Sequence, residues 1–145
     1  MTVDVTTEIS IARPRDEVAS YATDPSNAPT WYDNIDTVEW KTEPPPRVGT
    51  QVAFAARFLG RRLAYTYELV ELEAGARLVM RTADGPFPME TTYEWRDEGD
   101  GLTHMTLRNR GEPAGFSKVM APFMASAMRR ANRKDLAALK RILER

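Results

Sequence analysis

Closely spaced turn signals divide the middle of the chain, from Asp36 onward, into short segments rich in aromatic and β-branched residues. The signals lie at residues 44–49, Gly60, Gly75, 84–86 and 100–101. Connections this short cannot hold crossover helices, so neighbouring strands must pair as antiparallel hairpins. The spacing therefore predicts one continuous antiparallel meander.

Within these segments one alternating set of side chains is apolar, and the set between them is largely charged. The apolar set is Val38, Trp40, Val52, Phe54, Ala56, Phe58, Leu63, Tyr65, Tyr67, Leu69, Leu78, Met80, Met89, Tyr93, Trp95, Met105 and Leu107. We assign this set to the concave face of a curved sheet whose other face is exposed to solvent. In the fourth segment, Val70 and Leu72 fall in the opposite set.

The N-terminal part of the chain predicts a strand followed by two short helices. Polar and apolar residues alternate from Val3 to Ile11, which is typical of a half-buried strand. Pro14 opens a short helix that extends to about Ala22. Asp24-Pro25 resembles a second cap and first turn, and the segment that it opens leads to Trp31 and Tyr32.

The C-terminal part predicts the long helix of the chain, over about residues 115–144. Phe116, Val119 and later apolar residues recur at spacings of three and four. Pro122 lies inside this pattern, so the first turns are expected to kink or to form a separate piece. A helix about 10 to 12 Å across cannot fill a wide concave sheet. The pattern thus predicts an α+β fold with an internal cavity between sheet and helix.

The element order, β-α-α, a six-stranded meander and a long helix, resembles the SRPBCC superfamily of START-like or Bet v 1-like helix-grip proteins. The resemblance covers essentially the whole chain and is carried by residues 13–18, 24–31, 71–80, 100–103 and 135–140. These stretches look like the polyketide cyclase/dehydrase-like branch. The resemblance implies a curved sheet of six to seven strands that wraps the C-terminal helix.

The length and composition of the chain exclude several classes of protein and of binding site. The length of 145 residues fits one domain, residues 1–145. The absence of cysteine excludes disulfides and thiolate sites, and a net charge of −1 argues against a nucleic-acid partner. The longest apolar run, Val52 to Ala56, is too short to span a membrane. With no signal-like N-terminus, we expect a cytoplasmic protein.

Aromatic and methionine side chains on the predicted concave face, beside the entrance and on the helix are the candidate ligand contacts. They are Trp31, Tyr32, Phe54, Phe58, Tyr65, Tyr67, Met80, Met89, Tyr93, Trp95, Met105, Met120, Phe123 and Met124. Ordinary core packing explains such residues equally well. The group as a whole favours a site for a small hydrophobic molecule.

Catalytic motifs are scarce. His104, the only histidine, falls on the predicted sheet exterior, so neither a Ser-His-Asp triad nor a histidine metal cluster can form. No nucleotide-binding glycine motif is present, and we expect no cofactor. If the protein is an enzyme, the resemblance implies aldol-type cyclisation or dehydration of a poly-β-ketone. Tyr65, Tyr67 and Tyr93 are the candidates for polarising carbonyls.

Asp33 and the basic residues of the last helix are both expected to lie on the solvent-exposed surface. Asp33 follows the Trp31-Tyr32 pair and is expected in solvent near the cavity mouth. The basic residues of the last helix, at 129–134 and 140–141, are interrupted by Asp135 and Glu144 and suit an exposed face. We identify no catalytic acid and base pair among these residues.

These observations leave three hypotheses. The first is binding of a small lipid-, aromatic- or polyketide-like molecule between the sheet and the C-terminal helix. The second is a polyketide aromatase/cyclase or dehydrase that uses the same cavity. The third is a protein-interaction module with a collapsed cavity, and a homodimer stays open as an alternative to a monomer. Because the inward set is mostly apolar, the sequence favours binding.

Overall fold

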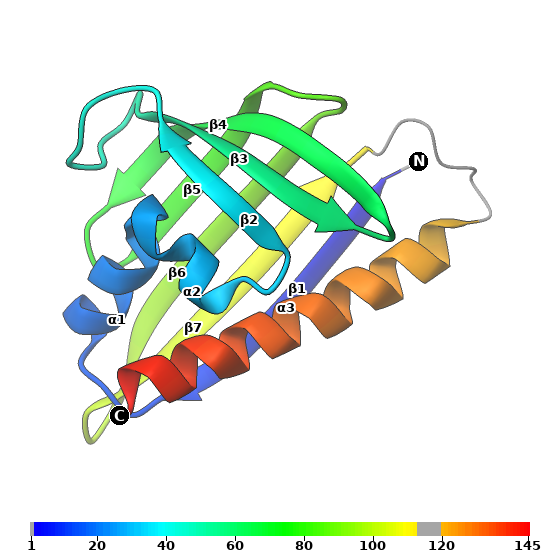
Figure 1. Ribbon diagram of the computed structural model, residues 1–145. Coiled ribbons are helices and arrows are strands. Elements are labelled where there is room, and N and C mark those ends of the chain that lie inside the picture. The colour runs from blue at the N-terminus through cyan, green and yellow to red at the C-terminus, as the bar shows by residue number, and fades with distance from the viewer. Residues whose placement is uncertain (1, 113–119) are drawn as a thin grey trace.

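The computed structural model describes residues 2–112 and 120–145, and its main feature is a seven-stranded antiparallel sheet curled into a half-barrel (Figure 1). The strands lie in the order β1-β7-β6-β5-β4-β3-β2. Their bounds are β1 Val3–Ile11, β2 Ile35–Trp40, β3 Gln51–Phe58, β4 Arg61–Glu73, β5 Arg77–Asp84, β6 Met89–Gly99 and β7 Leu102–Gly111. The predicted meander is confirmed, and β1 completes it by pairing with β7.

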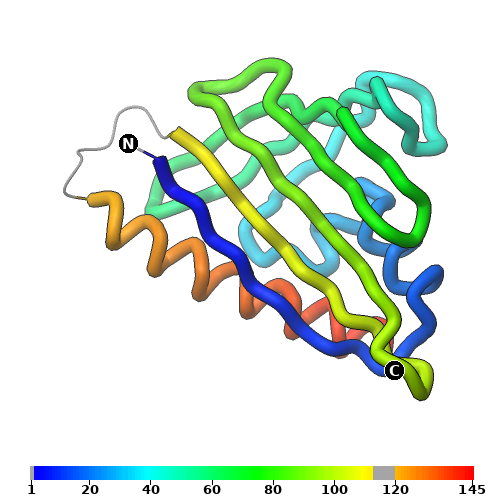
Figure 2. Tube along the Cα trace, turned by 180° about the vertical axis from the view of Figure 1, so that it is seen from behind, coloured from blue at the N-terminus to red at the C-terminus, as the bar shows by residue number. Residues whose placement is uncertain are grey.

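Helices cover the concave side of this sheet. The described helices are α1 Arg15–Thr23, the 3-10 turn η1 Pro25–Asn27, α2 Ala28–Trp31 and α3 Ala121–Leu143. The long helix α3 runs beside β1 along the open side of the half-barrel, and α2 lies between α3 and the β2 edge (Figures 1 and 2). The predicted α+β helix-grip architecture is confirmed. Among the described residues, no helix is both long and apolar enough to cross a bilayer.

The start of α3 differs from the prediction. The helix begins at Ala121, and the first part of the predicted helix, with Phe116 and Val119, lies outside the described residues. Pro122 therefore occupies the first turn of α3, where a backbone N–H has no partner within a helix. At this position Pro122 removes no hydrogen bond from α3, and the segment before it, where the kink or separate piece was expected, lies outside the described residues.

A β-bulge explains why simple alternation misplaced Leu72. In the pairing of β4 with β5, Leu69 lies opposite Met80, and Leu72 lies opposite Leu78, with a shift in register between them. One extra residue, Val70, reverses the side-chain alternation beyond it. Leu72 consequently packs against the main core, on the same face as Leu78.

The core has two parts that meet α3 at different points. The main cluster fills the concave face and includes Leu136, Leu139 and Leu143 of α3. A second, smaller cluster joins Val3 and Val5 of β1 to Met124 near the start of α3. No residue of α3 between Met124 and Leu136 packs a fully buried aliphatic side chain against either cluster. This gap locates the candidate site.

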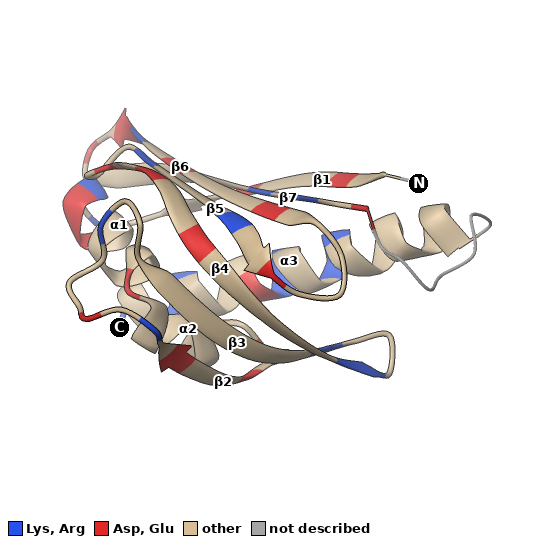
Figure 3. Cartoon of the chain, turned by 90° about the horizontal axis from the view of Figure 1, so that it is seen from above, with Lys and Arg blue, Asp and Glu red and all other residues tan. Residues whose placement is uncertain are grey.

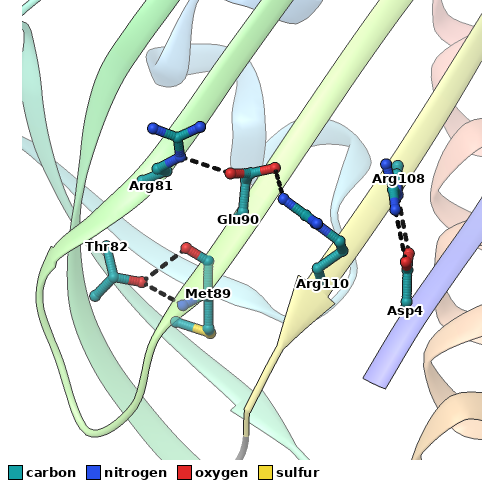
Figure 4. Close-up of polar contacts among 7 residues, drawn as sticks. All are labelled: Asp4, Arg81, Thr82, Met89, Glu90, Arg108 and Arg110. Carbon is teal, nitrogen blue, oxygen red and sulfur yellow. Dashed lines mark hydrogen bonds and ion pairs between the residues drawn. The ribbon is translucent and has the colours of Figure 1, made fainter. Parts of the chain in front are cut away.

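Charged side chains link neighbouring strands of the sheet, and acidic and basic residues are interspersed along the chain (Figure 3). The Glu90 carboxylate lies 2.6 Å from a nitrogen of Arg81 on β5 and 2.6 Å from one of Arg110 on β7 (Figure 4). Arg108 pairs with Asp4 through two hydrogen bonds of 2.9 and 2.6 Å. These pairs connect four adjacent strands from β5 to β1.

The β5–β6 connection is closed by a reciprocal contact. The Thr82 hydroxyl accepts a hydrogen bond from the Met89 backbone N–H at 2.8 Å and donates one to the Met89 carbonyl at 3.1 Å (Figure 4). The backbone of Met89 is thereby fixed at the start of β6. Its side chain reaches the concave side, where it lines the cavity described next.

Candidate functional site

A cavity lies between the concave face of the sheet and the middle of α3. Its volume is about 130 Å³. Residues of α1, η1 and α2 close one end, and Phe58 and Leu63 of the β3–β4 hairpin lie at another part of the wall. The predicted void between helix and sheet is therefore present.

The walls are mainly aromatic and aliphatic. Eight of the residues singled out from the sequence line the cavity: Tyr32, Phe54, Phe58, Tyr65, Tyr67, Met80, Met89 and Tyr93. The rings of Phe54, Tyr65 and Tyr67 form a packed group, with centroids 5.0 to 6.1 Å apart. Such walls suit a guest with a large apolar surface.

The other six predicted contacts lie elsewhere. Trp31, Trp95 and Met105 belong to the main core, with Trp31 packed behind Tyr32 at a ring distance of 4.3 Å. Met120 and Met124 pack in the second cluster against β1. Phe123 is 70% exposed, because it lies on the outer side of α3. None of these six lines the cavity.

Two tyrosines from distant parts of the chain meet in the cavity wall. The hydroxyl oxygens of Tyr32, which follows α2, and Tyr93 on β6 lie 2.6 Å apart. Burial raises the pKa of both phenols well above the usual tyrosine value, and it raises the pKa of Tyr67 to about 12. These hydroxyls stay protonated at neutral pH. They can donate hydrogen bonds, but they cannot act as phenolate bases.

A chain of polar side chains runs across the inner face of the sheet to α3. The hydroxyls of Tyr67 and Thr91 lie 2.8 Å apart, and Thr91 donates to Asn109 Oδ1 at 2.6 Å. Asn109 Nδ2 in turn donates to Asn132 Oδ1 at 3.2 Å. Because the Thr91 proton is used by Asn109, Tyr67 must be the donor to Thr91. The chain ends at Asn132, whose Nδ2 is buried without a partner.

Asp135 is the acid of the cavity wall. It lies one turn beyond Asn132 on α3, is only 2% exposed, and accepts a hydrogen bond at Oδ1 from the Asp33 backbone N–H at 3.1 Å. Burial raises the pKa of its carboxyl to about 6, although the Asp33 hydrogen bond and Lys134 act in the opposite direction. Asp135 can therefore exchange a proton close to neutral pH.

Sequence reasoning missed Asn132 and Asp135, yet a signal was present. Met120, Met124 and Met128 are four residues apart, and the next step of four is Asn132. A further step of three reaches Asp135, followed by Leu139 and Leu143 of the buried stripe. Polar residues on the apolar stripe of a helix are expensive to bury, so they indicate a site. Because many of the surrounding residues are arginine or lysine, the sequence predicted an exposed face for this part of the helix instead.

Of the residues expected at the surface, Asp33 is exposed and His104 is largely covered by its neighbours. His104 lies on the convex side of the sheet, where its ring nitrogens are 3.4 Å from Glu8 and 3.4 Å from Glu98, and its side chain is 13% exposed. The Asp33 side chain is 73% exposed and pairs with Lys134. Within residues 2–112 and 120–145, no group of three His, Cys, Asp or Glu side chains could hold a metal ion.

The comparisons with known proteins agree with this architecture. Residues 2–144 match the model of the family described as polyketide cyclase/dehydrase and lipid transport. The chain belongs to this family. It is thereby a member of the SRPBCC superfamily, as its resemblance implied. Among proteins with curated functions, no sequence matches it.

Solved structures with the same fold have little sequence in common with this family member. TTHA0849 of Thermus thermophilus has a TM-score of 0.83 at 19% identity, with 97% of this chain and 96% of that chain covered. The Zhui aromatase/cyclase of a Streptomyces species has a TM-score of 0.83 at 15% identity, with 100% and 95% covered. A START superfamily protein of Mycobacterium smegmatis has a TM-score of 0.82 at 13% identity, with 97% of each chain covered. At these identities the likeness shows the fold alone.

Proposed function

We propose that this protein binds a small, mainly apolar molecule with one ring in the cavity between the sheet and α3. The observation that carries the proposal is the cavity itself, a space of about 130 Å³ walled by aromatic and methionine side chains. The family description, which includes lipid transport, supports a hydrophobic guest. Burial of the apolar surface of the guest would supply most of the affinity.

The cavity volume favours a single ring over a larger skeleton. An engineered apolar cavity of about 150 Å³ in another protein binds benzene, whereas pockets for drug-sized molecules span roughly 300 to 1,000 Å³. The space of about 130 Å³ is close to the first value. Multi-ring compounds and long acyl chains would have to extend out of it.

Binding can be tested with native mass spectrometry and thermal shifts. The protein is purified from its own host for mass spectrometry, and the purified protein is then heated with single-ring, multi-ring and long-chain compounds. A ligand at one hundred times its Kd stabilises the native state by about 2.7 kcal/mol, so single-ring compounds should raise the midpoint clearly. No copurified ligand and no shift with any compound would contradict the proposal. A shift with multi-ring compounds alone would contradict its size limit.

A second candidate is an aromatase/cyclase or dehydrase reaction in the same cavity, and the Asp135 carboxyl favours it. This group can move a proton near neutral pH, and the Tyr32–Tyr93 pair lines the same cavity, where the hydroxyl that accepts within the pair keeps its own proton to polarise a carbonyl oxygen. The family description and the name of the Streptomyces enzyme support this candidate. In this reaction Asp135 would remove the proton between two carbonyl groups.

The catalytic candidate predicts a specific pH profile. Asp135→Asn keeps the hydrogen bond from Asp33, because an amide oxygen also accepts, but it removes the base. Turnover of a poly-β-ketone should fall at least a hundredfold in Asp135→Asn, and the acidic limb near pH 6 should disappear. Asp33→Asn, at the exposed neighbour, is the matched control. Unchanged turnover in Asp135→Asn would eliminate the catalytic role of Asp135.

A further inference from the structure

Two hydrogen-bond donors in the cavity wall have no partner among the described residues. Asn132 lines the cavity, is 4% exposed, and has no partner for Nδ2. Tyr65 also lines the cavity, and its hydroxyl has no hydrogen bond to a described residue. A buried donor without a partner is costly, so a ligand that supplies an acceptor to Asn132 Nδ2 removes this cost, and the partly buried Tyr65 hydroxyl offers a second donor.

The side-chain network determines which end of the Asn132 amide is free. Thr91 donates to Asn109 Oδ1, which leaves the Asn109 amide nitrogen to donate to Asn132 Oδ1. The oxygen of Asn132 is thereby occupied, and its NH₂ group is left unpaired. With the hydrogen bonds arranged in this direction, the free group of Asn132 is its NH₂ donor. A ligand must supply an acceptor to pair with it.

The charges around the cavity argue against an anionic guest. No lysine, arginine or histidine is among the described residues that line it, and Asp135 is its acidic residue. A carboxylate guest would lose its hydration without gaining a cationic partner, and it would lie in the same cavity as the Asp135 carboxylate. A neutral oxygen avoids both costs.

We infer that the cavity selects neutral single-ring molecules carrying a carbonyl-type acceptor, received by the free donors of Asn132 and Tyr65, over hydrocarbons and carboxylates of the same shape. This inference rests on the proposed binding function and adds the chemical class of the ligand. It applies equally to a carried molecule and to a substrate.

Three compounds of similar size test the inference by isothermal titration at pH 7.5. Acetophenone has the ring and the carbonyl group, ethylbenzene lacks the carbonyl, and benzoate replaces the methyl group by a charged oxygen. In the wild-type protein acetophenone should bind, and benzoate should bind at least tenfold more weakly. Benzoate that binds as tightly as acetophenone would overturn the inference.

The ratio of the ethylbenzene Kd to the acetophenone Kd is the sharper measure, because the hydration of each free compound is the same for every variant. Tyr65→Phe and Asn132→Leu each remove one free donor. The ratio should fall about fivefold in at least one of them, as expected for one hydrogen bond. Tyr21→Phe is the matched control, since its hydroxyl bonds Thr30 at the surface and Tyr21 does not line the cavity.

The outcomes separate this inference from the proposed function. If acetophenone and ethylbenzene bind but the ratio is unchanged in both variants, the donor inference is wrong and the binding function stands. If neither compound binds the wild-type protein, both are wrong. Tighter binding of aniline than of acetophenone would show that the cavity selects donors rather than acceptors, which would also overturn the inference. Tyr65→Phe keeps the test valid if Asn132→Leu impairs folding, because it breaks no hydrogen bond to a described residue.

Discussion

Asp135 Oδ1 on α3 accepts a hydrogen bond from the backbone N–H of Asp33 at 3.1 Å, a contact between residues 102 positions apart in sequence. It ties the middle of α3 to the segment that follows α2. The contact positions the Asp135 carboxyl in the cavity wall, close to Tyr32. The same carboxyl is buried, so its ionisation is coupled to the stability of the fold.

Ionisation of Asp135 should make the protein less stable as the pH rises from 4 to 7. Its pKa is about 6 in the folded chain against 3.8 for the free side chain, so the native state holds the extra proton between these values. The contribution is present below pH 3.8 and is lost as the pH passes 6, at up to about 1.4 kcal/mol per pH unit. Urea denaturation at several pH values measures this loss, which should total roughly 3 kcal/mol over the whole titration.

Asp135→Asn is the control for this pH dependence, because it cannot ionise. Its free energy of unfolding should not show the loss between pH 4 and 7. Asp4 and Glu90 act in the opposite sense: their pKa values are lowered, mainly by their arginine partners, so they destabilise the protein only at lower pH. Parallel curves for wild type and Asp135→Asn would show that Asp135 titrates normally.

Tyr93→Phe should destabilise the protein by about 1 kcal/mol, because it removes the hydrogen bond to Tyr32. Tyr65→Phe should change the free energy of unfolding by less, since its hydroxyl bonds no described residue. Equilibrium urea unfolding of both variants makes the comparison. Equal effects would argue against the Tyr32–Tyr93 bond. If the protein is an enzyme, both variants should also lower turnover while remaining folded.

Thr91→Val should cost about 2 to 4 kcal/mol, because it leaves the Tyr67 hydroxyl and Asn109 Oδ1 without partners inside the fold. Thr92→Val is a matched control on the same strand. Thr92 is also buried, but it lies on the other face of β6 and its side chain makes no hydrogen bond to a described residue, so its change should be close to neutral. Chemical denaturation of the two variants gives the difference. A cost for Thr91→Val no larger than that of Thr92→Val would contradict the network.

The architecture could be predicted because it depends on periodicity and turns. Each strand repeats with a period of two, and every predicted turn lies between two strands. Leu72 was misplaced because a bulge of one residue leaves no mark in the alternation. Apolar spacing continues through Pro122, whereas α3 begins at Ala121 with that proline in its first turn, so spacing alone does not fix where this helix begins.

The aromatic wall of the site followed from the same alternation, but its polar end did not. Asp135 lies among mostly basic residues of the last helix and was interpreted as part of a solvated face, and Asn132 carried no prediction. Their role emerges only when α3 is placed opposite Thr91 and Asn109, which come from strands distant in sequence. Partners of this kind cannot be assigned from spacing in one chain.

NMR of protein labelled with 13C in its methionine methyl groups tests most directly whether the cavity takes up a ring. Met80, Met89 and Met128 line the cavity, whereas Met105 and Met124 are buried outside it and serve as internal controls. Titration with acetophenone should shift the first three methyl resonances with one common Kd, because the bound ring alters their magnetic environment, and should leave the two controls in place. No shift at saturating acetophenone, or shifts confined to Met105 and Met124, would contradict the account.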